Sequence, residues 1–77
     1  MQFEWDPAKA RENEAKHGIS FMEASEVFGD DYSSAVPDPH HSVSEGRYLI
    51  FGVSRTGKYL VVSYTERGDR IRLISAR

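Results

Sequence analysis

The chain has 77 residues, a net charge of −2 and no cysteine. A chain this short builds one small core, so we expect a single domain over residues 1–77, held by neither disulfides nor thiolate metal sites. No apolar run approaches the roughly 18 residues of a membrane span, and the N-terminus shows no signal-peptide pattern. We therefore expect a cytoplasmic protein without a membrane segment.

Charge is divided unevenly along the chain. Residues 1–46 carry three cationic and ten acidic side chains, a net charge of −7, whereas residues 47–77 carry seven cationic and two acidic ones, a net charge of +5. Six of those seven cations are arginine, whose planar fork suits phosphate. The basic half could therefore bind a polyanion. Composition alone favours the alternative, a solvated surface on which the charges of the two halves pair.

The N-terminal residues predict a strand followed by a helix. Side chains alternate between polar and apolar over residues 2–5, the pattern of a short strand with one apolar face. Asp6 then suits the N-cap of a helix and Pro7 its first position. The helix ends at Gly18, a good left-handed C-cap. Its apolar face is thin, so we expect it on the surface.

A second helix is predicted directly afterwards. Ser20–Glu23 forms a capping box, in which the Ser and Glu side chains each satisfy a backbone N–H group. Phe21, Ala24 and Phe28 fall on one helical stripe, and Gly29 ends the helix. We expect this helix to pack on the sheet.

The rest of the chain predicts an antiparallel meander. Strand-like runs lie at residues 47–55, 58–65 and 70–76. Tight turns at Thr56-Gly57 and Glu66–Asp69 join them. Ser34–Val36 is a possible short strand, which the neighbouring prolines restrict to an edge. The order β-α-α-β-β-β predicts an α+β fold, an antiparallel sheet with two helices on one face.

Two distant parts of the chain carry a family resemblance. The motifs are Phe3–Pro7 (FEWDP), Ala15–Phe21 (AKHGISF) and Thr65–Arg77 (TERGDRIRLISAR). They resemble the terminal signatures of the BrnT family of bacterial toxins, whose members usually continue past this end with a further basic, helical stretch. The resemblance implies a RelE-like fold and a ribonuclease that inhibits translation. It also implies a BrnA-type ribbon-helix-helix antitoxin, through which the complex binds promoter DNA.

Metal-independent RNA cleavage defines what such a site must contain. A base deprotonates the ribose 2′-OH, cations stabilise the charged phosphorane, and an acid protonates the leaving 5′-oxygen. With the family in view, the expected catalytic residues are Arg77, Glu66, His17 and Arg67, with Arg77 ranked first. The expected RNA-binding residues are Arg47, Lys16, Arg70 and Arg72.

Each of these residues also has an ordinary structural role. Arginine at a strand edge keeps a surface soluble. A neighbouring arginine would keep Glu66 ionised and able to accept a proton, yet carboxylates are common in turns. His17 and Lys16 sit where cations interact with a helix dipole. The assignment of base and acid therefore stays open.

A metal site is the less favoured interpretation of Asp38, His40 and His41. Their spacing matches no known ligand motif, and adjacent histidines point apart on an extended chain. We expect a polar loop here, and neither a metal nor a cofactor.

Aromatic side chains on the strands could stack on RNA bases. The candidates are Tyr48, Tyr59 and Tyr64. Strand alternation places Tyr48 with Ile50, and Tyr64 with Leu60 and Val62, which favours packing in the core or on the sheet over stacking on bases. Trp5 is likewise expected in the core.

Two functions remain open. The first is an endoribonuclease held inactive by its antitoxin, and the second is a non-catalytic binding module that partners a DNA-binding antitoxin in promoter autoregulation. A basic sheet that binds RNA also offers a site for acidic antitoxin side chains, so both partners could use one surface.

Overall fold

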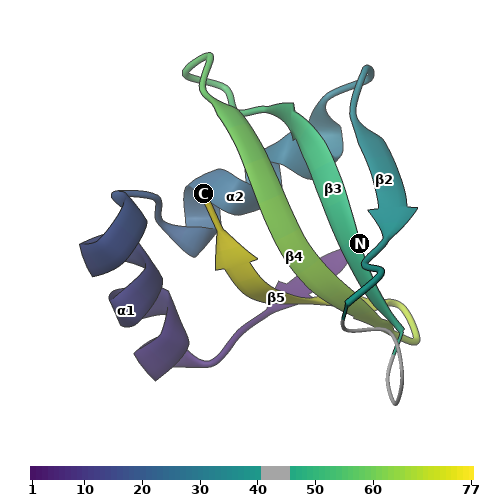
Figure 1. Cartoon of the computed structure of the whole chain (residues 1–77), viewed down its shortest axis with the longest axis horizontal. Coiled ribbons are helices and arrows are strands. Elements are labelled where there is room, and N and C mark those ends of the chain that lie inside the picture. The colour runs from purple at the N-terminus through teal and green to yellow at the C-terminus, as the bar shows by residue number, and fades with distance from the viewer. Residues whose placement is uncertain (41–45) are drawn as a thin grey trace.

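The computed structural model describes residues 1–40 and 46–77. Its elements are β1 (Gln2–Glu4), α1 (Pro7–His17), α2 (Phe21–Glu26), the 3-10 helix η1 (Val27–Gly29), β2 (Ser34–Pro37), β3 (Arg47–Val53), β4 (Tyr59–Arg67) and β5 (Arg70–Ala76). The strands form a five-stranded sheet in the order β1-β5-β4-β3-β2. In Figure 1, α2 crosses behind this sheet and α1 lies beside the end of β5. The predicted α+β class is confirmed.

The sheet is mixed, not antiparallel throughout. Strands β2 to β5 pair antiparallel, which confirms the meander. Strand β1 pairs parallel to β5, with Phe3 opposite Ile71, so the predicted all-antiparallel sheet is wrong at this edge. Alternation over residues 2–5 indicates a strand but not its partner, whereas each tight turn fixes the direction of the strand that follows it.

The predicted caps of α1 are confirmed, and they fix where the helix ends. The Asp6 carboxylate accepts the N–H of Ala8 at 2.9 Å. Gly18 adopts a left-handed conformation with φ of 72° and donates its N–H to the carbonyl of Glu14. The α1 helix lies on the surface as expected, with Asn13 as its buried residue.

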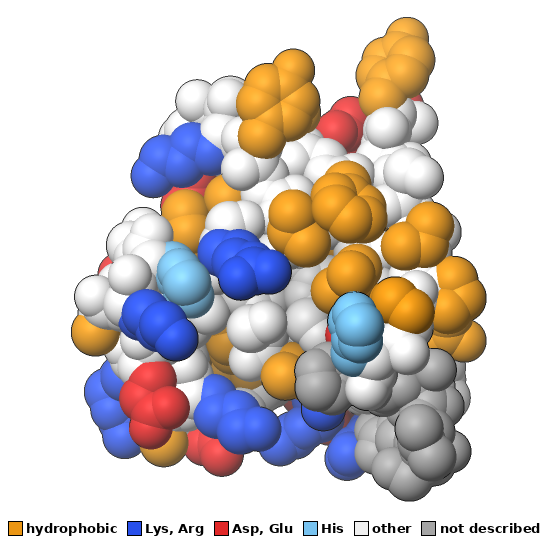
Figure 2. Space-filling model, in the orientation of Figure 1, with side chains coloured by type: hydrophobic (Ala, Val, Ile, Leu, Met, Phe, Trp, Pro, Cys, Tyr) orange, Lys and Arg blue, Asp and Glu red, His pale blue; other side chains and the backbone are white. Residues whose placement is uncertain are grey.

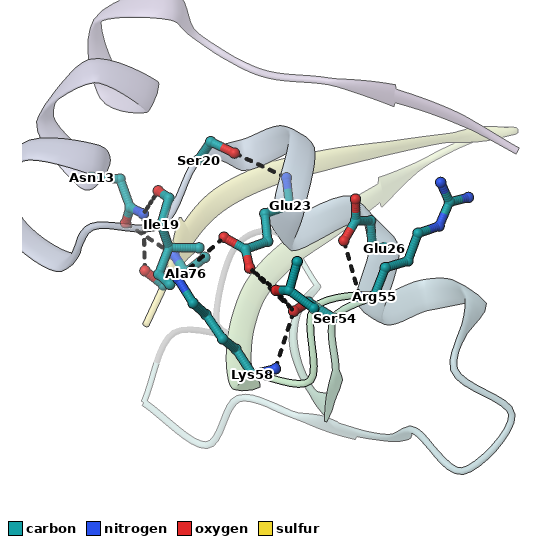
Figure 3. Close-up of polar contacts among 10 residues, drawn as sticks. Asn13, Ile19, Ser20, Glu23, Glu26, Ser54, Arg55, Lys58 and Ala76 are labelled. Carbon is teal, nitrogen blue, oxygen red and sulfur yellow. Dashed lines mark hydrogen bonds and ion pairs between the residues drawn. The ribbon is translucent and has the colours of Figure 1, made fainter.

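The turns differ from their predicted lengths. Strand β4 runs on to Arg67, so the β4–β5 turn contains only Gly68 and Asp69. The β3–β4 loop is longer, covering residues 54–58, and it is tied to α2: the hydroxyls of Ser54 and Thr56 donate to the carboxylate of Glu23 at 3.1 and 2.9 Å. Figure 3 shows this contact. Ser20 caps α2 as predicted, but the Glu23 side chain binds the hairpin.

The core lies between the α2–η1 segment and the sheet face turned toward it. Phe21, Ala24 and Val27 are buried there against the strands. On the sheet the buried apolar side chains are Ile50, Leu60, Val62, Tyr64, Ile71, Leu73 and Ala76. The ring of Trp5 packs edge-on against Phe21, with centroids 5.9 Å apart, which confirms its place at the core.

Gly52 on β3 marks the closest approach of the sheet to η1. A Cβ there would lie 2.8 Å from Cγ1 of Val27 and 3.1 Å from a carboxylate oxygen of Asp30. Gly52→Ala should therefore lower the free energy of unfolding by about 1–3 kcal/mol, measured by urea denaturation. Gly29→Ala is the matched control, since a Cβ there meets nothing within 4 Å. Equal stabilities of the two variants would contradict this packing.

Candidate functional site

The sheet face turned away from α2, which we call the open face, changes in character along its strands. Cross-strand register places Arg47, Thr65, Arg72 and Glu4 in one row near the β4–β5 turn. Further along, Phe51 lies opposite Val61. Figure 2 views this face: Lys and Arg side chains gather near α1 and the C-terminus, and hydrophobic ones gather over β3 and its neighbours.

A pocket of about 400 Å³ opens on this face between α1, β5, β4 and β3. We call it the basic pocket, and its lining residues are Lys16, His17, Asp38, His40, Arg47, Leu49, Val61, Ser63, Ile74, Ser75 and Arg77. They comprise three Lys or Arg cations and two imidazoles against one carboxylate. Such a balance favours an anionic group, and phosphate matches the fork of arginine.

A bulge in β5 is what directs Arg77 to the open face. Leu73 lies in the core and pairs with Tyr64, but Ser75 pairs with Ser63, so Ile74 is an extra residue in β5. Without it, strict alternation from Leu73 would turn Arg77 toward the core. The extra residue reverses the alternation, which buries Ala76 and leaves Arg77 exposed over the pocket.

The backbone around Arg77 is held from both sides. Arg77 and Val61 exchange two backbone hydrogen bonds, at 3.0 and 2.7 Å. On the other side, the buried amide of Asn13 accepts the N–H of Ala76 at 3.0 Å and donates to its carbonyl at 2.9 Å. The same amide donates to the carbonyl of Ile19 at 3.0 Å (Figure 3). Asn13 thus joins α1 to the end of β5, next to the arginine.

The same contact brings the last turn of α1 to the pocket. Lys16 and His17 occupy this turn, just before the Gly18 cap. A helix C-terminus favours cations, so their position is electrostatically favourable as well as close to Arg77. Both line the basic pocket.

The opposite wall comes from the segment before β3. Asp38 is buried; its N–H donates to the carbonyl of Arg47 at 2.8 Å, and its carboxylate accepts the N–H of His40 at 3.0 Å. This short side-chain turn directs His40 toward the pocket lining. The sequence predicts a polar loop here and gives His40 no place at the site. The signal was present in Asp38-Pro39-His40, since an Asp two residues before a backbone N–H commonly forms such a turn.

A second, larger hollow of about 600 Å³ lies beside α2. Its charged lining residues are Glu26, Asp30 and Arg55. The carboxylates of Glu26 and Asp30 accept the backbone N–H groups of Arg55 and Val53, so they serve to hold the hairpin. Two carboxylates disfavour an anionic ligand, and the basic pocket is therefore the better candidate site.

Among residues 1–40 and 46–77, no group of three or more His, Cys, Asp or Glu side chains is placed to hold a metal ion. His41 lies outside this part of the chain. Within it, no helix is long and apolar enough to cross a membrane.

Comparison with known families identifies the chain. A family model described as the ribonuclease toxin BrnT of type II toxin–antitoxin systems matches residues 5–77. The chain belongs to the BrnT family. Its family consists of ribonuclease toxins, and the type II class implies an antitoxin partner. A comparison with curated protein sequences gave no match.

The BrnT fold brings together half of the eight residues that the sequence singled out. Lys16, His17, Arg47 and Arg77 all line the basic pocket. Arg70 and Arg72 lie at the β1–β5 edge, where both donate to Glu4, at 3.3 and 3.2 Å. The hydrogen bond from Arg72, reinforced by Arg70, lowers the pKa of Glu4. Glu4 thus offsets part of the charge of these two arginines.

Glu66 and Arg67 lie at the far end of β4. Glu66 pairs with the buried Ile71 and shares its side of the strand with Tyr64, so it faces away from the basic pocket. It is five residues from Val61, the partner of Arg77, or about 16 Å along the strand. Arg67 pairs with Arg70 beside the β4–β5 turn. The structure therefore does not bring Glu66 to Arg77.

Proposed function

We propose that this chain is a metal-independent endoribonuclease toxin that cleaves RNA in the basic pocket. The observation that carries the proposal is the convergence of Lys16, His17, Arg47 and Arg77, from three separate parts of the sequence, on one pocket of the open face. A lining of three Lys or Arg cations against one carboxylate suits a phosphate, and imidazoles are the side chains that most often transfer protons in enzymes. The pocket thus offers the groups that phosphodiester cleavage requires.

The reaction follows from these groups. One imidazole takes the proton of a ribose 2′-OH, and the 2′-oxygen attacks the adjacent phosphorus. The bond to the 5′-oxygen breaks, and a second proton donor protonates that oxygen, leaving a 2′,3′-cyclic phosphate and a free 5′-OH. His17 and His40 are our candidates for the two proton transfers. Arg77, Arg47 and Lys16 stabilise the charge that builds on the phosphorane oxygens.

The biological role rests on the family. We propose that the toxin inhibits translation in the cytoplasm and has a RelE-like fold. Its partner would be a BrnA-type ribbon-helix-helix antitoxin, and the complex would bind promoter DNA. An antitoxin segment rich in carboxylates would fit the basic pocket and exclude RNA from it.

The experiment that tests the proposed function separates it from a non-catalytic binding role. Inducing the chain alone should arrest growth, and co-expression of the neighbouring antitoxin should relieve the arrest. The purified protein should cleave total RNA with EDTA present and leave cyclic phosphate ends. If the protein binds the antitoxin but neither arrests growth nor cleaves RNA, it is a binding module.

Substitutions of His17 and Glu66 can be compared directly, because both are candidate catalytic residues from the sequence and the fold places only His17 at the basic pocket. His17→Gln should lower the cleavage rate about 100-fold or more, since a general acid or base contributes that much. Glu66→Gln should change it less than about threefold, because Glu66 faces the other side of the sheet. The rates are compared on one labelled RNA under single-turnover conditions. A larger loss in Glu66→Gln would overturn this placement of the chemistry.

A further inference from the structure

The open face carries a second feature, beyond the basic pocket. Three aromatic side chains line a hollow of about 410 Å³ at its other end, and we call Tyr32, Phe51 and Tyr59 the aromatic site. Their exposed fractions are 95%, 43% and 86%. Aromatic rings this exposed do no packing in the core, in contrast to Tyr48 and Tyr64, whose rings stack beneath the sheet at 5.6 Å. The sequence expectation of packing is therefore met by Tyr48 and Tyr64 but not by Tyr59.

The aromatic site is continuous with the basic pocket. Phe51 pairs with Val61, and Val61 exchanges backbone hydrogen bonds with Arg77. Two strand spacings thus separate Phe51 from Arg77, or about 10 Å. Val61 lines the basic pocket and lies between the two. When a ligand's phosphate is bound at Arg77, the chemical groups next to that phosphate would therefore reach the aromatic rings.

The charge of the aromatic site indicates which groups of the ligand would lie there. Its charged lining residue is Asp30, whose two carboxylate oxygens accept the N–H groups of Tyr32 and Val53. A carboxylate repels phosphate but not a neutral base. The phosphates of a nucleic acid chain are thus drawn to the basic pocket and its bases to the rings.

We propose that the aromatic site binds unpaired bases by stacking, so that this toxin acts on single-stranded RNA. The inference rests on the proposed function and deepens it by naming the substrate class. Paired bases are enclosed in their helix and cannot lie flat on Phe51 or Tyr59, whereas splayed bases of a single strand can. Stacking tolerates every base, so the site selects for strandedness more than for sequence.

The test uses two probes of the full chain. The first is a fluorescent single-stranded RNA ten nucleotides long, whose 2′-O-methyl riboses prevent cleavage by the toxin. The second is linear inorganic polyphosphate, which has charge but no bases. Phe51→Leu and Tyr59→Leu keep apolar bulk but remove the aromatic face. Met22→Ala removes an exposed apolar side chain from α2 and is the matched control.

The expected result is a selective loss. Phe51→Leu and Tyr59→Leu should each weaken RNA binding by about 5- to 150-fold, equivalent to about 1–3 kcal/mol per stacked base. Polyphosphate binding and the salt dependence of RNA binding should not change. Phe51→Trp should restore RNA affinity, Met22→Ala should match the wild type, and thermal unfolding should confirm that all variants are folded.

Several results would overturn the inference. RNA affinities of the leucine variants within twofold of the wild type would do so, as would equal wild-type affinity for the same RNA annealed into a duplex. Loss of antitoxin binding with unchanged RNA binding would reassign the surface to the protein partner. If the wild type cleaves RNA while the leucine variants behave normally, only this inference fails. If the wild type neither binds nor cleaves RNA, the proposed function fails with it.

Discussion

Arg77→Ala should lower the rate of RNA cleavage about 100- to 1,000-fold and relieve growth arrest, while leaving the fold intact. Removing a single preorganised donor to a transition-state anion costs about this much. Arg77 is exposed over the basic pocket, and its backbone is fixed through Val61, so the side chain contributes to the site and little to the core. Single-turnover cleavage and thermal unfolding, measured on the same preparation, check both halves of this expectation.

Two further substitutions define what Arg77 contributes. Arg77→Lys keeps the charge but loses the two-pronged grip on phosphate, so it should recover only part of the activity. Arg70→Ala removes an arginine from the same face, but one that binds Glu4 at the edge of the sheet. It should cost less than about fivefold, as expected of a surface charge. Equal losses for Arg70→Ala and Arg77→Ala would mean that general positive charge, and not this pocket, carries the activity.

Asn13→Ala should be among the most destabilising single changes in the molecule, although Asn13 lies on a surface helix. It would leave the N–H and carbonyl of Ala76 and the carbonyl of Ile19 without their side-chain partner in a buried place. Each such group costs about 1–3 kcal/mol, so the three together should cost about 3 kcal/mol or more in urea denaturation. A core this small supplies only about 3–5 kcal/mol, so much of the protein should unfold.

Asn13→Asp tests the same contact through the pH dependence of stability. A carboxylate can accept the N–H of Ala76 but would face the carbonyls of Ile19 and Ala76, which disfavours its charged form and raises its pKa on folding. The difference in free energy of unfolding between the variant and the wild type should therefore be smallest below the unfolded-state pKa of Asp at this position. The variant should lose further stability as the pH rises through the folded-state pKa of that carboxyl. Glu14→Ala, an exposed position on the same helix, should change stability by less than about 0.5 kcal/mol. A stable Asn13→Ala protein would contradict the anchoring role.

Local signals in the sequence were enough for the helices and for most of the strands. Asp6, Gly18 and Ser20 each act through a hydrogen bond or backbone conformation within four residues, and the structure confirms all three caps. The meander follows from turn residues next to apolar runs. What local signals cannot give is the partner of β1, because its neighbour β5 is more than 60 residues away in the chain.

The functional site was harder to predict, since it depends on long-range contacts. Arg77 reaches the open face only through the bulge at Ile74, and nothing in the Ile74-Ser75-Ala76 sequence marks a bulge. Asn13 looks like an ordinary surface residue until Ala76 lies against it. Glu66 is a candidate because of the family motif and its neighbour Arg67, but strand alternation turns it to the opposite face.

The most direct test of the central claim is where RNA lies on the protein. In an NMR titration of ¹⁵N-labelled protein with the 2′-O-methyl single strand, the backbone amides of Val61, Ser63, Ser75 and Arg77 should shift with saturating RNA. The amides of Met22 and Ser25 on α2 should not move, because that side of the molecule lies behind the sheet. Shifts confined to α2 and the hollow beside it, with the open face unchanged, would contradict the assignment of the basic pocket as the site of RNA cleavage.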